Sequence, residues 1–378
     1  MFDYATLRFI WWALLGVLLV GFAIFDGFDL GVALLHPFVA KKDVERRVLI
    51  NTIGPVWEGN QVWFILGGGA VFAAWPPLYA ASFSGFYLAM LLVLIGFILR
   101  PVSITFRSKR DEPLWRATWD WLFFVSGALP SVLFGVAFGN LLLGVPFHFD
   151  QSLRFQYEGD LLSLLHPFAL LCGIVSAVML FMQGAAWLAG KTEGEINARA
   201  RGIGAAAALA LVLLLLAGGL WIATGIEGYR IESDVNYAGP SNPFGKTVVA
   251  GAGEWLLNYA RFPLAAFAPL AALLGALGAA ILLAIGSPLA ILASSVSVAG
   301  VVTTAGFSLF PFLLPSSSHP DESLTVWDAS SSQATLGLML VAALFFLPIV
   351  LTYTSWVYWV LRGAVREAAI EKGDDHYY

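Results

Sequence analysis

The segment AIFDGFDLGVALL, residues 23–35, places two aspartates in one of the most apolar parts of a chain of 378 residues. The segment GPVWEGNQVWFIL, residues 54–66, does the same with a glutamate. A charged carboxylate in the middle of a bilayer costs at least about 2.5–3.5 kcal/mol. Because such a group must face a partner or a cavity, these segments predict a membrane protein with a polar site inside it.

The composition supports a membrane fold, since 59% of the residues are hydrophobic and only 12% are charged. An average soluble domain has about twice that charge. Runs of about 20 apolar residues recur, each long enough to cross a hydrocarbon core of about 30 Å. The runs are continuous and do not alternate, which favours helices over the strands of a barrel. We therefore expect an all-α integral membrane protein, with residues 1–378 forming a single polytopic membrane domain.

Nine transmembrane helices are predicted, and the distribution of basic residues predicts their orientation. Of the 20 lysines and arginines, 15 follow the first, third, fifth and ninth spans. Basic residues concentrate on the cytoplasmic side, so we expect the N-terminus outside and the C-terminus in the cytoplasm. The spans lie near residues 7–35, 48–72, 78–99, 119–143, 161–187, 202–224, 262–285, 289–313 and 334–361.

The acidic residues of the first two spans form a candidate proton path. Asp26 and Asp29 are three residues apart and share one helix face. At about 1.5 Å per residue, Asp29 lies about 9 Å and Asp26 about 14 Å from the end of the first span at Leu35. Glu58 lies about 15 Å from the start of the second span. Carboxyl groups that step inward from the cytoplasmic side on neighbouring helices are typical of a proton relay.

A structural role explains the same residues in a different way. Asp26 and Asp29 are also placed to end the first span near the headgroups, or to pair with Arg100 or Lys41. Both interpretations stay open from the sequence alone.

The nearby polar side chains have supporting roles in either case. Asn60 and Gln61 would hold water in a channel or hydrogen-bond neighbouring helices. For Arg100 and Asp120, which lie at span ends on the same side, we expect a structural ion pair.

The remaining candidate ligands predict no catalytic or metal centre in this chain. None of the five histidines lies in the middle of a span, so no pair is placed to hold a haem within the membrane. Zinc-ligand spacings and a phosphate-binding glycine loop are missing. The single cysteine, Cys172, lies in an apolar run and cannot form an internal disulfide. No nucleic-acid partner is expected.

Several long segments resemble subunit 2 of the bacterial cytochrome bd quinol oxidases. They are DYATLRFIWWALLGVLLVGFAIFDGFDLGV, PVWEGNQVWFILGGGAVFAAWPPLYAASFSGFY and SLTVWDASSSQATL, and the shorter VAFGNLLLGVPF and NPFGK are similar as well. The resemblance runs from the N-terminus to the last span. It implies two four-helix bundles plus one peripheral helix in the cytoplasmic (inner) membrane of a bacterium.

The resemblance also implies a partner and cofactors. In this family the haem-bearing subunit 1 holds two b-type haems and one d-type haem, and subunit 2 holds none. The complex oxidises ubiquinol and reduces dioxygen, which generates a proton motive force without pumping. A small single-span subunit and a structural quinone bound among the helices are further features of the family.

Two proton-path residues carry over from the family to this sequence. Asp29, in GFDLG, matches the family's proton-channel aspartate on the first helix. Glu58, in VWEGNQVW, stands where the family's form WDGNQVW has an aspartate, so the acidic side chain at this position is longer by one methylene.

Two other functions remain open at this point. Acids within the membrane also suit a proton-coupled secondary transporter, although only the first two spans show polar interruptions. A purely structural partner of the haem subunit is the third reading.

Overall fold

The computed structural model describes residues 2–371 and is mostly helical. Within these residues, eight helices are long and apolar enough to cross a membrane. They are α1 (Tyr4–Val39), α5 (Tyr87–Phe106), α6 (Pro113–Leu143), α7 (Pro167–Lys191), α8 (Gly194–Gly225), α10 (Phe267–Ile285), α11 (Ala290–Leu309) and α12 (Gln333–Val360).

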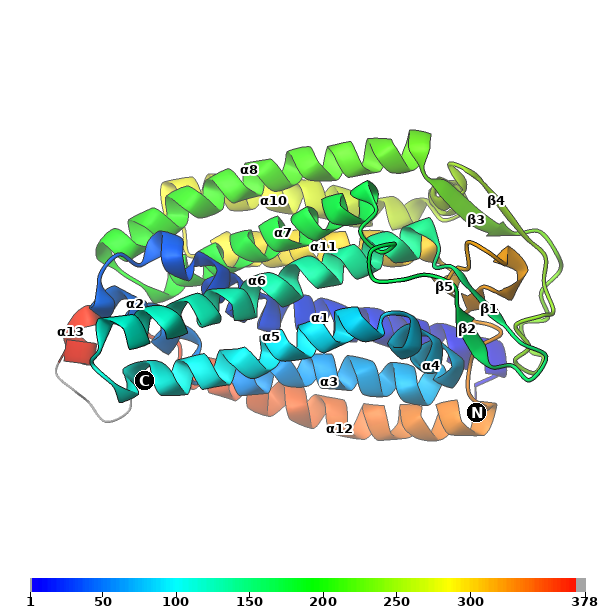
Figure 1. Cartoon of the computed structure of the whole chain (residues 1–378), viewed down its shortest axis with the longest axis horizontal. Helices are drawn as coiled ribbons and strands as arrows, with labels where there is room; N and C mark the ends of the chain where they lie inside the picture. The colour runs from blue at the N-terminus through cyan, green and yellow to red at the C-terminus, as the bar shows by residue number, and fades with distance from the viewer. Residues whose placement is uncertain (1, 372–378) are drawn as a thin grey trace.

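The second predicted span is wrong as a single helix. The chain forms α2 (Asp43–Ile53) and then, after a break, α3 (Trp57–Ala74), which lies beside α1 and α12 (Figure 1). Pro55 explains the break, because its ring clashes with the carbonyl one turn earlier and it has no N–H to donate. With its polar first turn, α3 is not among the eight helices that are long and apolar enough to cross a membrane.

Other predicted ends also shift. The third span is divided into α4 (Pro76–Gly85) and α5, with Phe86 between them in a non-helical conformation. The fifth begins at Pro167, where the fixed φ of proline suits the first helical position, and His166 accepts a hydrogen bond from the Phe168 N–H. The sixth begins at Gly194 because its polar first turns extend the helix.

The long helices lie side by side along the longest axis of the molecule, and the short elements cover its two ends (Figure 1). One end carries α2 and α13 (Glu367–Glu371), and the other carries the N-terminus and three antiparallel strand pairs. The pairs are β1 (Phe147–Phe149) with β2 (Phe155–Tyr157), β3 (Glu227–Ile231) with β4 (Val248–Ala252), and β5 (Phe312–Leu314) with β6 (Leu324–Thr325). The short helices are α9 (Leu257–Arg261), η1 (Arg107–Lys109), η2 (Glu254–Leu256), η3 (Pro263–Ala266) and η4 (Pro320–Glu322).

Arg8 holds the loops at the strand-bearing end against α1. Its side chain is fully buried and donates to the Ser330 hydroxyl at 2.6 Å and to the Tyr237 carbonyl at 2.8 Å. A third bond reaches the Gly239 carbonyl at 3.1 Å. One charged side chain therefore fixes two loops that are far apart in the sequence.

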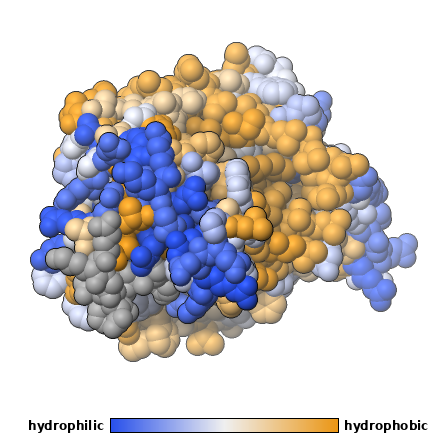
Figure 2. Space-filling view, turned by 60° about the vertical axis from the view of Figure 1, so that its left-hand side comes forward, coloured by the Kyte–Doolittle hydropathy of each residue, from blue (hydrophilic) through white to orange (hydrophobic). Residues whose placement is uncertain are grey.

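The surface matches a membrane-embedded bundle. Hydrophilic residues gather on the end that carries α2 and α13, and a broad apolar band follows beyond it (Figure 2). The apolar side chains of α12 show the same pattern, since Leu338 and Leu344 are 74% and 67% exposed.

The centre of the bundle is α1, which contacts α3, α6, α7 and α11. Its Gly31 lies against Gly184 of α7, and a Cβ at position 31 would lie 2.8 Å from the Gly184 Cα and clash with the Leu180 carbonyl oxygen. Small residues permit such close approach of membrane helices. The contact fixes one face of α1 and leaves the aspartate-bearing part free to meet α3 and α5.

We expect Gly31→Ala to lower the stability of the assembled protein by about 1–3 kcal/mol, the usual cost of overpacking a filled core. The matched control is Gly16→Ala on the same helix, because a Cβ there has no atom within 4 Å. Thermal unfolding in detergent measures both variants. Equal midpoints for Gly31→Ala and the control would contradict the proposed packing role.

Candidate functional site

Asp26 of α1 and Arg100 of α5 form a buried ion pair. Arg100 Nη1 lies 2.5 Å from Asp26 Oδ1, and Nη2 lies 3.1 Å from Oδ2. Both side chains are 0% exposed. The two-point contact matches the guanidinium fork to the carboxylate, which is the strong geometry for such a pair. Of the two sequence-based alternatives for Asp26, the geometry is that of pairing with Arg100.

Asp29 lies one turn further along α1 in a different setting. Its Oδ2 accepts a hydrogen bond from Asn60 Nδ2 at 2.8 Å and lies 4.0 Å from Arg100 Nη1. Its Oδ1 is buried and has no hydrogen-bond partner among the described residues. Two carboxylates thus share one guanidinium, and the cluster is negative by one charge unless a carboxyl holds a proton. Compared with Asp26, Asp29 lies farther from the Arg100 guanidinium, and its Oδ1 has no hydrogen-bond partner among the described residues.

A hydrogen-bonded series leads from Asp29 to α12. Asn60, on α3, accepts a 2.5 Å hydrogen bond at Oδ1 from the Tyr358 hydroxyl while its amide donates to Asp29. Tyr358 is half-buried and lies near the C-terminal end of α12. Sequence reasoning missed this residue, because it lies in the aromatic run YTSWVYW, residues 353–359, and no pattern marks one tyrosine of that run.

Glu58 does not meet Asp29 within this chain. It lies in the first turn of α3 with an exposed side chain, while the neighbouring Asn60 is buried and makes the contact. Residues two apart on a helix point to different sides. Gln61 is half-buried on the same turn, and no hydrogen bond joins it to the aspartates.

Asp120 belongs to a separate ionic cluster at the end that carries α2. It accepts bonds from Arg107 Nε at 2.5 Å and Arg46 Nη1 at 2.7 Å, and His36 Nε2 lies 3.5 Å away. Arg100 and Asp120 are therefore both in ion pairs, but not with each other. The cluster joins the end of α1, the start of α2, η1 and the first turns of α6.

Glu45 of α2 ties that helix to α8 beside the ionic cluster. It accepts from Arg199 Nη2 at 2.6 Å and from the backbone N–H groups of Lys41 and Lys42 at 2.6 and 3.1 Å. Burial acts to raise the pKa of Glu45, but these hydrogen bonds outweigh it and lower the pKa from 4.5 to about 2. The charged form is the one that the fold stabilises.

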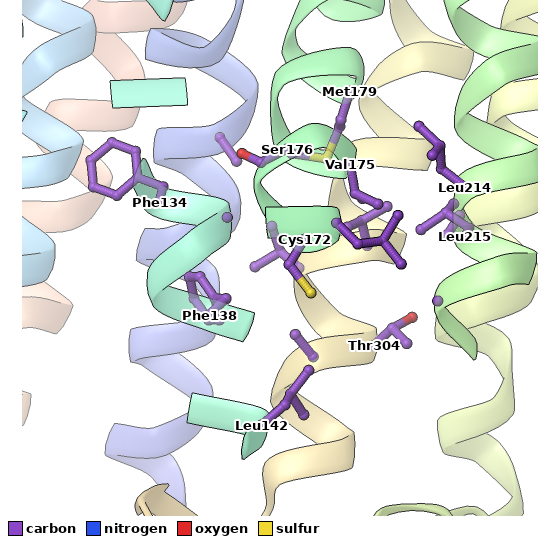
Figure 3. A pocket seen from close by; sticks show the side chains of 18 of the residues that line it. Phe134, Phe138, Leu142, Cys172, Val175, Ser176, Met179, Leu214, Leu215 and Thr304 are labelled. Carbon is purple, nitrogen blue, oxygen red and sulfur yellow. The ribbon is translucent and has the colours of Figure 1, made fainter. Parts of the chain in front are cut away.

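An apolar pocket of about 320 Å³ lies between the helices (Figure 3), and its lining includes neither Asp26 nor Asp29. Phe134 and Phe138 of α6 face it from one side, and Leu214 and Leu215 of α8 face it from the other. The residues labelled in the figure are Phe134, Phe138, Leu142, Cys172, Val175, Ser176, Met179, Leu214, Leu215 and Thr304. Such a lining suits a hydrophobic chain and offers few polar contacts.

Comparison with known proteins decides the family. Residues 7–361 match the model of the cytochrome bd terminal oxidase subunit II family. The chain belongs to this family. It is therefore a subunit of an oxidoreductase complex, a subunit II implies a subunit I beside it, and the apolar helices make it a multi-pass membrane protein.

Curated relatives agree over the whole length. The chain is 46% identical to the Escherichia coli K12 cytochrome bd-I ubiquinol oxidase subunit 2 over 385 residues, covering 100% of both chains. It is 46% identical to a probable cytochrome oxidase subunit 2 of Haemophilus influenzae, again over 100% of both. A subunit 2 from Bacillus subtilis is 31% identical over 96% of this chain and 97% of its own.

A solved structure shares the fold. The bd oxidase from Geobacillus thermodenitrificans matches with a TM-score of 0.67, covering 94% of this chain and 98% of that one. The identity is only 15%, so the match supports the arrangement of helices alone.

We expect Arg100→Gln to destabilise the subunit by about 3–5 kcal/mol, because it leaves Asp26 buried without its counter-charge. Adding Asp26→Asn should recover part of this loss, since the uncompensated charge is then removed. Unfolding by SDS titration of the purified complex measures both variants. Equal stability of wild type and Arg100→Gln would show that the pair is not needed.

The attachment of α2 to α8 should weaken in acid. The pKa of Glu45 is lower in the folded state than its ordinary value of 4.5, so its contribution is complete above pH 4.5 and is lost as the pH falls towards about 2. Amide hydrogen exchange in α2, corrected for intrinsic rates, should therefore accelerate over this interval. Glu45→Gln should expose α2 already at pH 6 and remove the acid-dependent change; an unaltered acid response in that variant would exclude Glu45 as its source.

Proposed function

We propose that this chain is the haem-free subunit 2 of a cytochrome bd-type ubiquinol oxidase in a bacterial inner membrane. The 46% identity to the E. coli ubiquinol oxidase subunit 2, which extends over the full length of both chains, supports ubiquinol as the substrate of the complex. The partner subunit 1 would hold two b-type haems and one d-type haem, with ubiquinol and dioxygen as substrates of the complex. A small single-span subunit would complete it.

In this proposal the chain crosses the membrane nine times, with α3 as the second span in addition to the eight most clearly apolar helices. Helices α1, α3, α5 and α6 form one bundle, α7, α8, α10 and α11 form the second, and the little-buried α12 is peripheral. The contacts of α5 with α6 and of α10 with α8 and α11 support the division, and the two bundles are packed together by α1 and α6 against α7. Arg46, Arg107 and Arg199 at the end carrying α2 support a cytoplasmic position for that end.

The subunit would supply cytoplasmic protons to the oxygen-reducing site of its partner. Asp29 carries the proton, and Arg100 holds Asp26 as a fixed ion pair beside it. Asn60 and Tyr358 orient Asp29 and line the approach from the end of α12. The observation that carries this proposal is the buried Oδ1 of Asp29, which no described side chain or backbone group satisfies.

Glu58 would pass the proton across the subunit interface. It is exposed on α3 only two residues from Asn60, which touches Asp29. A carboxylate facing lipid at this depth would cost at least about 2.5–3.5 kcal/mol, so a protein surface is the better neighbour. The exposed face of α3 would therefore contact subunit 1. Gln61, on the same turn, would hold water there.

The apolar pocket would suit a structural quinone. Phe134, Phe138 and the leucines of α8 fit an isoprenoid tail, while the hydroxyl-bearing residues of the lining, Ser176, Thr304 and Ser308, are candidates to contact a head group. The proposed proton path does not depend on a quinone in this pocket.

The test compares isosteric neutral variants in the purified, haem-replete complex. Asp29→Asn should lower oxygen consumption by about 100-fold, within the range that a positioned proton-transfer group contributes. Glu58→Gln should also lower it, and both should leave haem content unchanged. Glu227→Gln, an exposed acid on β3 at the opposite end, is the matched control. Normal turnover in assembled Asp29→Asn would refute the carrier role and leave a structural subunit.

A further inference from the structure

Three potential metal ligands converge at the strand-bearing end, away from the aspartates. His148, Glu158 and His319 each offer a ligand atom, and these atoms all lie within 4.8 Å of one another. His148 Nδ1 lies 2.9 Å from Glu158 Oε1, and the rings of His148 and His319 are 5.2 Å apart between centroids. The residues are separated by 10 and 161 positions in the sequence, so their spacing gave no sign of a site.

We propose that His148, Glu158 and His319 form a binding site for a Zn²⁺ ion. Two imidazole nitrogens and a carboxylate oxygen are ligands that zinc prefers, with a water molecule as the fourth. The side chains of His148 and Glu158 are 34% and 37% exposed, which leaves room for that water and for entry of the ion.

The backbone holds the three residues in place without an ion. His148 lies on β1, and Glu158 directly follows β2 and donates its N–H to the Pro146 carbonyl at 3.0 Å. On the other side, the His319 N–H donates to the Ser316 hydroxyl at 3.0 Å, and that hydroxyl donates to the carbonyl of Phe147 at 2.5 Å. The loop that carries His319 is therefore joined to the strand that carries His148.

Only side-chain adjustment is needed to close the site. Zinc–nitrogen bonds of about 2.0–2.1 Å place tetrahedral ligand atoms about 3.3 Å apart. Ligand atoms now within 4.8 Å reach that separation by moving about 1 Å, which rotation of exposed side chains allows. An ion pair explains the contact of His148 with Glu158, but not a second imidazole beside the same carboxylate.

A bound ion would clamp the β1–β2 hairpin to the loop before η4. Both lie over the end of the helix bundle that also carries the N-terminus (Figure 1). The site would stabilise these loops. It is independent of the proton path, because Asp29 lies near the other end of α1, about 15 Å from the helix end that is remote from the strands.

The experiment measures zinc bound to the purified complex after chelator treatment and reloading with ZnCl₂. Wild type should bind one zinc more than the variant that combines His148→Gln, Glu158→Gln and His319→Gln. Each single variant should weaken binding by at least about tenfold, because ligand loss costs no less than the loss of a second-shell partner. X-ray absorption at the zinc edge should show histidine ligation in wild type.

Matched controls are His166→Gln, an exposed histidine at the start of α7, and Glu227→Gln on β3. Both should bind zinc as wild type does, and haem content should confirm assembly of every variant. Zinc should also raise the unfolding temperature of wild type but not of the triple variant. Equal zinc content in wild type and the triple variant would overturn the proposal. Binding of Cu²⁺ to the wild type without any binding of zinc would overturn it as well.

Discussion

The arrangement of this subunit depends on one guanidinium enclosed in an apolar helix bundle. Arg100 is fully buried and grips Asp26 with two hydrogen bonds, which joins α5 to α1. A buried pair gains little net stability over apolar residues, but breaking it is severe because one charge is left uncompensated. The pair therefore fixes the relative position of two helices, and it also determines which nearby carboxyl remains available. Asp29 shares the same positive charge only at 4.0 Å.

The two faces of α1 make different kinds of contact: one packs closely against a neighbouring helix, and the other carries the buried aspartates. On one side Gly31 permits backbone contact with Gly184 of α7, which brings the two helices close together. On the other, aspartates one turn apart meet Arg100 and Asn60 from different helices. The close contact at Gly31 fixes the orientation of α1, and with it the positions of the aspartates on its other face. A proton carrier requires such a setting, since its partners must be fixed while its own charge changes.

The sequence was sufficient to predict the membrane fold and the family, and it singled out the acids on α1 as candidates. Apolar runs and the placement of basic residues carry that information locally. The break at Pro55 was not predictable from the residue type alone, because Pro37, Pro101, Pro130 and Pro348 lie inside α1, α5, α6 and α12. No local pattern shows which side chains of a helix face a given neighbour. Glu58 and Asn60 are two residues apart, and only tertiary packing decides which of them contacts Asp29.

Long-range partners were the other gap. Tyr358 reaches Asn60 across 298 positions, and His319 reaches His148 across 171. A lone tyrosine in an aromatic cluster and a lone histidine in a loop carry no periodicity that singles them out. Their roles come from how α12 and the strand-bearing loops fold back on the first half of the chain.

Infrared difference spectroscopy of the complex, reduced minus oxidised, tests most directly whether Asp29 is the group that exchanges protons. If Asp29 exchanges protons, a carboxylic-acid carbonyl signal is expected that shifts in D₂O, persists in Asp26→Asn and disappears in Asp29→Asn. A signal that remains in Asp29→Asn, or that disappears only in Asp26→Asn, would contradict this role of Asp29.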